Sequence, residues 1–159
     1  MDESTPAAWS VVIVTGDTGL GRGTGSLVEE FAGPVVTDPE AEDFVGAEVG
    51  SNNTAELTAF GEALRWLLIE GGDDRAVIRA DSQYAGNLAS GAWKAKANKA
   101  LVAHVQELWR AVAALRPISW DHVRAHRGHR WNERADHLAL RKAYNEPPVP
   151  LTFWKPGQR

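Results

Sequence analysis

Three acidic residues stand at positions from which a folded chain could bring them together. Asp81 follows the apolar run VIRA, Glu56 lies within NNTAEL, and Asp136 lies within NERADHLA. A fourth, Asp17, follows the first apolar run of the chain. Carboxylate oxygens are the ligands that Mg²⁺ takes in proteins, where it keeps several waters and meets substrate phosphates. The spacing therefore predicts a divalent-metal site built from strand ends and helix starts.

Such a site would suit the hydrolysis of a phosphodiester bond. The reaction needs an activated water in line with a leaving oxygen, and two metal ions about 3.5–4 Å apart can hold both oxygens. Each carboxylate also has a purely structural explanation. Asp81 could cap the helix that follows it, and Glu56 and Asp136 could interact with a helix dipole, which contributes about 0.3–1 kcal/mol. The residue types alone leave both explanations open.

The hydrophobic pattern indicates the elements that would position these residues. Strands are expected where β-branched apolar residues run together, and helices where apolar residues recur at helical spacing. The predicted strands are Trp9–Thr15, Ser26–Phe31, Phe44–Val49, Arg75–Ala80 and Ile118–Val123. Four helices are predicted: one capped by Asn53 or Thr54 and running to about Glu70, a short one after Asp81, one over about Lys99–Leu115, and one capped by Asn132 and running to about Tyr144. This order predicts an α/β fold with a five-stranded mixed sheet, whose first three strands are antiparallel, flanked by helices.

Length and composition fit one domain. The chain has 159 residues, of which 43% are hydrophobic, enough for a sizeable core. We expect an N-terminal extension over residues 1–8, a catalytic domain over 9–145, and a proline-rich tail over 146–159. The absence of cysteine excludes disulfides and thiolate-bound zinc. No apolar run reaches membrane-spanning length, so we expect a cytoplasmic protein, and a monomer.

The charges are unevenly distributed along the chain. The net charge of −4 argues mildly against a nucleic-acid partner. However, Lys and Arg are absent between Gly23 and Leu64, whereas basic residues gather beyond Trp93. Such asymmetry can create a basic footprint on an acidic protein. Taken by itself, this distribution of charged residues is explained more simply by a solvated surface with charges of both signs.

Three segments taken together resemble the motifs of type 1 ribonuclease H. They are NNTAEL, ADSQY and VRAHRGHRWNERADHLA, and the resemblance extends over about Trp9 to Tyr144. The order of elements is similar to that fold as well. The resemblance implies a divalent-metal-dependent endonuclease that hydrolyses the RNA strand of RNA/DNA hybrids and leaves 5′-phosphate and 3′-hydroxyl ends. It implies two Mg²⁺ ions, replaceable by Mn²⁺, on Asp17, Glu56, Asp81 and Asp136.

The resemblance also assigns a role to a histidine. The pattern H-x-G-H that begins at His126 is similar to a mobile loop of the family, whose first histidine assists proton transfer or product release. A near-neutral pKa suits that work. By the same comparison His129 is structural, and Asn132 and Glu133 are neighbours of the metal centre.

The first-strand motif departs from the family pattern. The family has Thr-Asp-Gly, whereas this chain has Thr15-Gly16-Asp17. A slip of one residue in a strand turns a side chain to the other face. Either Gly16 permits a bulge that returns Asp17 to the metal, or Gly16 occupies the ligand position and the site has three carboxylates. We favour the bulge, because the rest of the site is intact.

Recognition of a hybrid would require further contacts, which the resemblance supplies. It implies minor-groove and RNA-backbone contacts by Asn52, Asn53 and Gln83, and a DNA phosphate pocket that includes Ser51. Contacts with the DNA backbone are implied for Trp93, Lys94, Lys96 and Asn98. Each residue taken singly could instead serve a cap, a loop or the core. The segment between Asp81 and His126 is too short for the extra basic helix of some members, so we expect weak, salt-sensitive binding.

Two other functions and the role of the tail stay open at this point. The chain could cleave another duplex or a junction, or bind hybrids without cleaving them because of the shift at Gly16 and Asp17. In the tail, Phe153 and Trp154 could pack on the domain or dock a protein partner. A disordered end with incidental aromatic residues is an equally simple reading.

Overall fold

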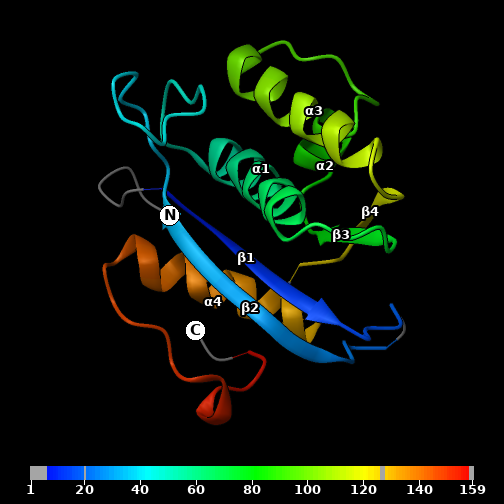
Figure 1. The fold of residues 1–159 in the computed structure, drawn as a ribbon. Coiled ribbons are helices and arrows are strands. Elements are labelled where there is room, and N and C mark those ends of the chain that lie inside the picture. Colours follow the sequence, from blue (N-terminus) through cyan, green and yellow to red (C-terminus); the bar gives the residue numbers. More distant parts are fainter. Residues whose placement is uncertain (1–6, 20, 126–127, 158–159) are drawn as a thin grey trace.

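The computed structural model describes residues 7–19, 21–125 and 128–157. These residues form four strands, four α-helices and one 3₁₀ turn (Figure 1). The order is β1 (Ala8–Thr15), β2 (Ser26–Pro34), α1 (Asn52–Glu70), β3 (Ala76–Ala80), α2 (Gln83–Ala89), α3 (Lys99–Ala113), β4 (Ile118–His122), α4 (Arg130–Ala143) and the turn Leu151–Phe153. All four helices and four of the five strands lie where the hydrophobic pattern predicts them.

The strands form two separate pairs. β1 and β2 are antiparallel, and an irregularity between Ile13 and Val14 leaves Val28 of β2 without a partner. β3 and β4 are parallel, so both end at the same edge. Within the described residues no ladder joins β1 to β3. The predicted five-stranded mixed sheet is therefore not formed, although its α/β composition and its antiparallel start are present.

The predicted third strand, Phe44–Val49, is a loop in the structure. Gly46 has φ +111°, and a Cβ atom at this position would lie 2.8 Å from the amide nitrogen of Leu101. This close approach fixes the segment against the first turn of α3. Ala47 is buried beside it, at 1% exposure. A backbone held in the left-handed region cannot continue an extended strand, which explains why the apolar residues here do not extend the sheet.

The main core lies among three helices. α1, α2 and α3 bury a cluster that includes Leu57, Leu64, Leu88, Leu101 and Val105. The N-cap of α1 is Ser51, two residues before the nearer predicted cap, Asn53. The Ser51 hydroxyl accepts from the amide of Thr54, and the Thr54 hydroxyl accepts from the amide of Ser51. This reciprocal cap sets the start of the helix that carries Glu56.

The hairpin of β1 and β2 separates α4 from the other helices (Figure 1). The Ser10 hydroxyl of β1 donates to the carbonyl of Ala135 in α4. At the other end, the indole of Trp131 donates to the carbonyl of Thr24 at 2.7 Å, in the turn before β2. These contacts fix the helix that carries Asp136.

The C-terminal tail folds back on α4. Trp154 is 3% exposed and lies against the rings and charges of α4 residues. Of the readings that the sequence leaves open, packing on the domain is the one that the structure shows. In the part of the chain that the structure describes, no helix is long and apolar enough to cross a membrane.

Candidate active site

Asp81 stands at the carboxyl end of β3, as its place after VIRA predicts. Its Oδ2 atom accepts from the side-chain amide of Asn132 in α4 at 3.3 Å. Its carbonyl oxygen lies 3.2 Å from Nε2 of His122, which ends the parallel neighbour β4. The next residue, Ser82, caps α2 by accepting from the amide of Ala85 at 3.0 Å. Asp81 is thus free of the capping role that would have been its structural explanation.

Glu56 lies close to Asp81 from the first turns of α1. Burial raises the pKa of Glu56 above its ordinary value, a hydrogen bond with the Ser82 side chain opposes the rise, and the negative charge of Asp81 adds to it. The charge of one carboxylate therefore acts on the other across the gap between α1 and β3. Two acidic groups brought together in this way form a natural place for a cation.

A cavity of about 660 Å³ separates the two strand pairs. Its walls come from β1, β3, α1 and α4, and all four predicted ligands line it: Asp17, Glu56, Asp81 and Asp136. Asp136 is exposed and lies one helical turn after Asn132. Over residues 7–19, 21–125 and 128–157, however, no three Asp, Glu or His side chains converge closely enough to hold one ion. The structure brings Glu56 and Asp81 together, and leaves Asp17 and Asp136 at the same cavity but apart.

Asp17 is engaged elsewhere. Its Oδ2 atom accepts from the guanidinium of Arg79 at 2.6 Å. Burial tends to raise the pKa of Asp17, but hydrogen bonds from Thr24 and Gly19 and the charge of Arg79 together hold the pKa below its ordinary value. Gly16 has φ +79°, so it turns the chain at the end of β1. The irregularity of the hairpin lies at Val28 and not at Gly16, so the expected bulge is absent.

The loop before α4 is described only in part. His126 lies outside the described residues. His129 caps α4, because its Nδ1 atom accepts from the amide of Asn132 at 3.3 Å, which confirms its structural role. α4 accordingly begins at Arg130, and its cap lies three residues before the predicted cap, Asn132.

The predicted groove-reading residues surround the Glu56 and Asp81 pair. Asn52 and Asn53 are exposed in the first turn of α1, and Gln83 is exposed at the start of α2. Ser51 is half-buried and its hydroxyl is engaged in the cap. Three exposed amide side chains therefore lie at two helix starts, close in the chain to Glu56 and Asp81.

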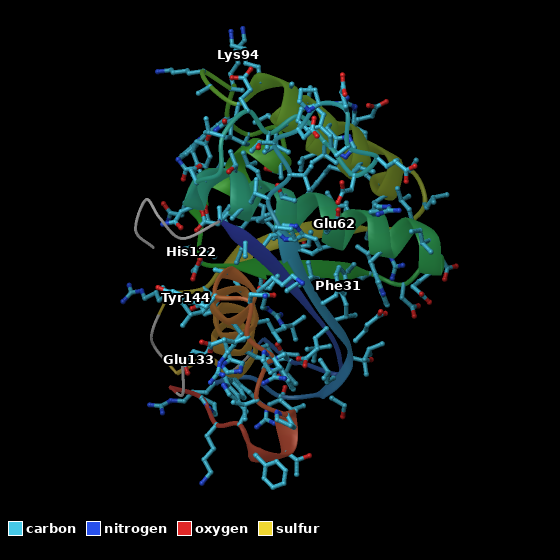
Figure 2. The ribbon with its side chains drawn as sticks, turned by 90° about the vertical axis from the view of Figure 1, so that its left-hand side faces the viewer. Phe31, Glu62, Lys94, His122, Glu133 and Tyr144 are labelled. Atoms are coloured by element: carbon cyan, nitrogen blue, oxygen red, sulfur yellow. The ribbon has the colours of Figure 1, made fainter. Side chains whose placement is uncertain are left out.

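The predicted DNA-backbone residues form a separate group on the loop between α2 and α3. Trp93 is 49% exposed, so the alternative that it serves the core is wrong. Lys94 and Lys96 are exposed beside it. Figure 2 shows Lys94 projecting from the end of the molecule, far from Glu133 at the start of α4. Asn98 differs, because it is half-buried and donates to the Tyr84 hydroxyl at 3.0 Å. Residues 90–98 form no helix, in agreement with the predicted lack of an extra basic helix.

Two site residues were not predicted from the sequence. Asn132 was expected to be only a neighbour, yet it holds the Asp81 carboxylate. Arg79 was not singled out, although a charged residue within an apolar strand was a usable signal. Arg79 is the penultimate residue of β3 and lines the same cavity as Asp81.

Comparison with known proteins decides the family. A model of the RNase H family matches residues 21–144. This chain belongs to the RNase H family. A ribonuclease H of Janthinobacterium sp. (strain Marseille) is 40% identical over 117 residues, which cover 67% of this chain and 78% of that protein. A ribonuclease HI of Neisseria meningitidis serogroup A is 36% identical over 115 residues, 65% of this chain and 76% of that protein.

A solved RNase H1 structure agrees with the type 1 branch of the family. The RNase H1 of the archaeon Halobacterium salinarum NRC-1 has a TM-score of 0.64 and 26% identity, over 91% of this chain and 92% of that one. The N-terminal RNase H domain of rv2228c from Mycobacterium tuberculosis has a TM-score of 0.63 over 89% of this chain and 84% of that one. At 22% identity the second likeness concerns the fold alone. RNase H enzymes depend on divalent metal ions.

The residues at the cavity suit such an ion in their chemistry. Glu56 and Asp81 supply carboxylate oxygens, the donor type that hard cations take. Their mutual repulsion, which contributes to the raised pKa of Glu56, is what a cation would relieve. The side-chain amide of Asn132 orients one of the two carboxylates, as outer partners of metal ligands commonly do.

Proposed function

We propose that this RNase H hydrolyses the RNA strand of RNA/DNA hybrids at a metal centre formed by Glu56, Asp81 and Asp136, with Asp17 as a fourth ligand. Membership of the RNase H family makes the chain an endoribonuclease. The observation that carries the proposed site is the pairing of Glu56 and Asp81 at the carboxyl end of β3. Two Mg²⁺ ions, replaceable by Mn²⁺, and products with 5′-phosphate and 3′-hydroxyl ends belong to the same proposal.

Each residue has a defined task in this scheme. A divalent ion held by these carboxylates would activate the attacking water and stabilise charge that develops on the phosphate. Asn132 keeps Asp81 in one orientation through its amide, and Ser82 does the same for Glu56 through its hydroxyl. His126 would take or give a proton as the product leaves, because an imidazole titrates near neutral pH.

Hybrid binding would use the two groups of exposed residues. Asn52, Asn53 and Gln83 are exposed at the starts of α1 and α2, and short amide side chains can contact the 2′-hydroxyls that distinguish RNA from DNA. Trp93, Lys94 and Lys96 offer an aromatic surface and ammonium groups to the DNA backbone. Ser51 and Asn98 are also part of the proposal, although their polar atoms are engaged in intramolecular hydrogen bonds. A monomeric catalytic domain over residues 9–145 and a cytoplasmic location complete it.

Cleavage of a panel of matched duplexes tests this function. The same sequence is presented as RNA/DNA, RNA/RNA and DNA/DNA with Mg²⁺, and the RNA ends are analysed after cleavage. We expect cleavage of the RNA strand of the hybrid alone, with 5′-phosphates on the products. Cleavage of the DNA duplex at a similar rate would point to the alternative nuclease.

One observation favours a second candidate function. Because Arg79 occupies the carboxylate of Asp17, the metal centre could be impaired and the chain could bind hybrids without cutting them. Retention of a hybrid in a gel, with no cleavage in either Mg²⁺ or Mn²⁺, would support this alternative. Cleavage in either metal would exclude it.

A further inference from the structure

Both carboxylate oxygens of Asp17 are engaged. Oδ2 accepts from Arg79 at 2.6 Å. Oδ1 accepts from the Thr24 hydroxyl at 3.0 Å, the Thr24 amide at 3.1 Å and the Gly19 amide at 3.2 Å. The side chain is 9% exposed. Among the described residues, Oδ2 thus accepts from a single donor, and that donor carries charge, so a cation at Oδ2 would compete with Arg79 for the same carboxylate.

The turn that contains Gly19 packs against the side chain of Arg79. A Cβ atom on Gly19 would lie 2.5 Å from its Nη2 atom, so the turn packs directly over the guanidinium. Arg79 also connects the two strand pairs, because it belongs to β3 and Asp17 follows β1. The ion pair thus joins the two strand pairs beside the cavity that both residues line, and no ladder connects these pairs within the described residues.

A second carboxylate lies within reach of the same guanidinium. Oδ2 of Asp121, on β4, is 4.0 Å from Nε of Arg79. The Asp121 side chain is 63% exposed, so it can move with little hindrance. Arg79 therefore lies between a buried carboxylate that it binds closely and an exposed one that it approaches.

We propose that Arg79 is a positioning residue that keeps Asp17 out of the metal centre until it transfers to Asp121. The proposal rests on the proposed function, since it concerns the same metal centre. The guanidinium carries its charge at every physiological pH, so it competes with a divalent cation for Asp17 under all working conditions. Asp121 gives Arg79 a second anion to pair with, and this makes release of Asp17 easier.

Mn²⁺ binding to the full chain, measured by calorimetry without nucleic acid, tests the proposal. Loss of a close charge-assisted pair frees Asp17, so Arg79→Gln should bind Mn²⁺ about tenfold more tightly or better. The matched control is Arg75→Gln, which removes the same charge about 13 Å away along the strand. At that distance screening in 0.1 M salt should keep the change below about twofold. An affinity in Arg79→Gln no higher than in Arg75→Gln would overturn the proposal.

Substitution of Asp17 in the otherwise unchanged chain gives a second comparison, which does not require Arg79→Gln to fold. While Arg79 occupies Asp17, Asp17→Asn should weaken Mn²⁺ binding by clearly less than Asp81→Asn does, which should lower the affinity by about tenfold or more. In the Arg79→Gln background, Asp17→Asn should remove the gain. If Asp17→Asn alone weakens Mn²⁺ as much as Asp81→Asn does, Asp17 is already a ligand and the proposal is wrong.

Hybrid cleavage separates failure of this inference from failure of the proposed function. If the proposal holds, Arg79→Gln reaches half-maximal cleavage at a lower Mg²⁺ concentration than the unchanged chain. If the unchanged chain cleaves and Arg79→Gln needs the same Mg²⁺ concentration, the nuclease stands and the role of Arg79 is refuted. If the unchanged chain neither cleaves nor binds Mn²⁺ in an Asp81-dependent way, the proposed metal centre itself fails, and the role of Arg79 with it.

Discussion

Arg134 of α4 lies against the indole of Trp154, with its guanidinium carbon 5.3 Å from the ring centroid. Both side chains are nearly inaccessible, at 1% and 3% exposure. Arg134 also donates to the carbonyl of Val149 at 2.7 Å, and His137 accepts from the amide of Val149 at 2.9 Å. The tail is therefore attached to α4 through Arg134 and His137, which do not line the cavity.

Truncation of Trp154 should destabilise the whole domain. A buried tryptophan replaced by alanine loses about 3–5 kcal/mol of unfolding free energy, and here a cation–π contact is lost as well. Urea unfolding of Trp154→Ala measures the loss. The control is Phe153→Ala at the preceding residue, which is 74% exposed and should change stability by less than about 0.5 kcal/mol. Equal stabilities of the two variants would show that the tail is not anchored.

Removal of one partner from the ion pair of Arg134 and Glu30 should lower the stability of the fold. Glu30 accepts from Nε and Nη2 of Arg134 at 2.8 and 2.6 Å. Glu30→Gln would leave a buried guanidinium without a counter-charge, so we expect a loss of about 3 kcal/mol in unfolding free energy.

A second glutamate paired with α4 supplies the control for that change. Glu146 contacts Arg141 at 3.3 Å with a side chain that is 56% exposed, and Glu146→Gln should lose less than about 1 kcal/mol. If both substitutions have equally small effects, the pair of Arg134 and Glu30 contributes no more than a surface contact.

Substitution of Gly86 by a larger residue should destabilise the fold. A Cβ atom at this position of α2 would lie 2.4 Å from the ring of Trp120, which is too close without movement of the indole. Overpacking of this kind costs about 1–3 kcal/mol, so Gly86→Ala should lower the midpoint of thermal unfolding. Gly61 in α1 is the matched control, because its Cβ would meet the nearest atom at 3.4 Å. Gly61→Ala should be neutral or stabilising by up to about 1 kcal/mol. A Gly86→Ala variant as stable as Gly61→Ala would contradict the observed packing.

Glu62 should make stability depend on pH. Burial raises its pKa in the folded chain, the charges of Arg65 and His104 oppose the rise, and Asp43 adds to it. The folded chain therefore binds a proton at Glu62 more readily than the unfolded chain does. The favourable contribution is complete below the unfolded pKa, near pH 4, and is lost as the pH rises through the folded pKa.

The uncharged Glu62→Gln variant isolates this effect. We expect it to be more stable than the unchanged chain at pH 7 and to lose that advantage near pH 4, in unfolding followed at both pH values. Glu107→Gln, an exposed change on α3, should give no such difference. An equal advantage of Glu62→Gln at both pH values would show that the effect does not arise from ionisation.

The sequence could predict the elements that depend on local spacing. The apolar stripe of α1, the run VIRA before Asp81 and the motif around Asp136 each lie within one element, and each was placed correctly. The cap of α1 was predicted two or three residues too late, because Ser51, Asn53 and Thr54 stand close together and all can cap a helix. Local chemistry cannot choose among them.

The relationships that the sequence could not predict connect distant residues. Arg79 and Asp17 are 62 positions apart, and nothing in either segment specifies the other. Trp154 is buried because it packs on Arg134 and His137 of α4. From the sequence, a helix surface with a charged and a polar residue would be expected to face solvent. Gly46 packs on α3 in a conformation that ends the expected third strand. Each outcome depends on tertiary contacts that override the local pattern.

The most direct test of the metal centre is Mg²⁺-dependent cleavage of end-labelled RNA in an RNA/DNA hybrid by Asp81→Asn. Loss of an outer partner of a metal ligand already costs about 10–100-fold, so loss of this carboxylate should lower the rate at least about a hundredfold. The control is Asp73→Asn, which removes the same charge from an exposed loop before β3 and should cleave at the unchanged rate. If Asp81→Asn, folded and at equal concentration, cleaves the hybrid as fast as Asp73→Asn, the metal centre proposed at Glu56, Asp81 and Asp136 is contradicted.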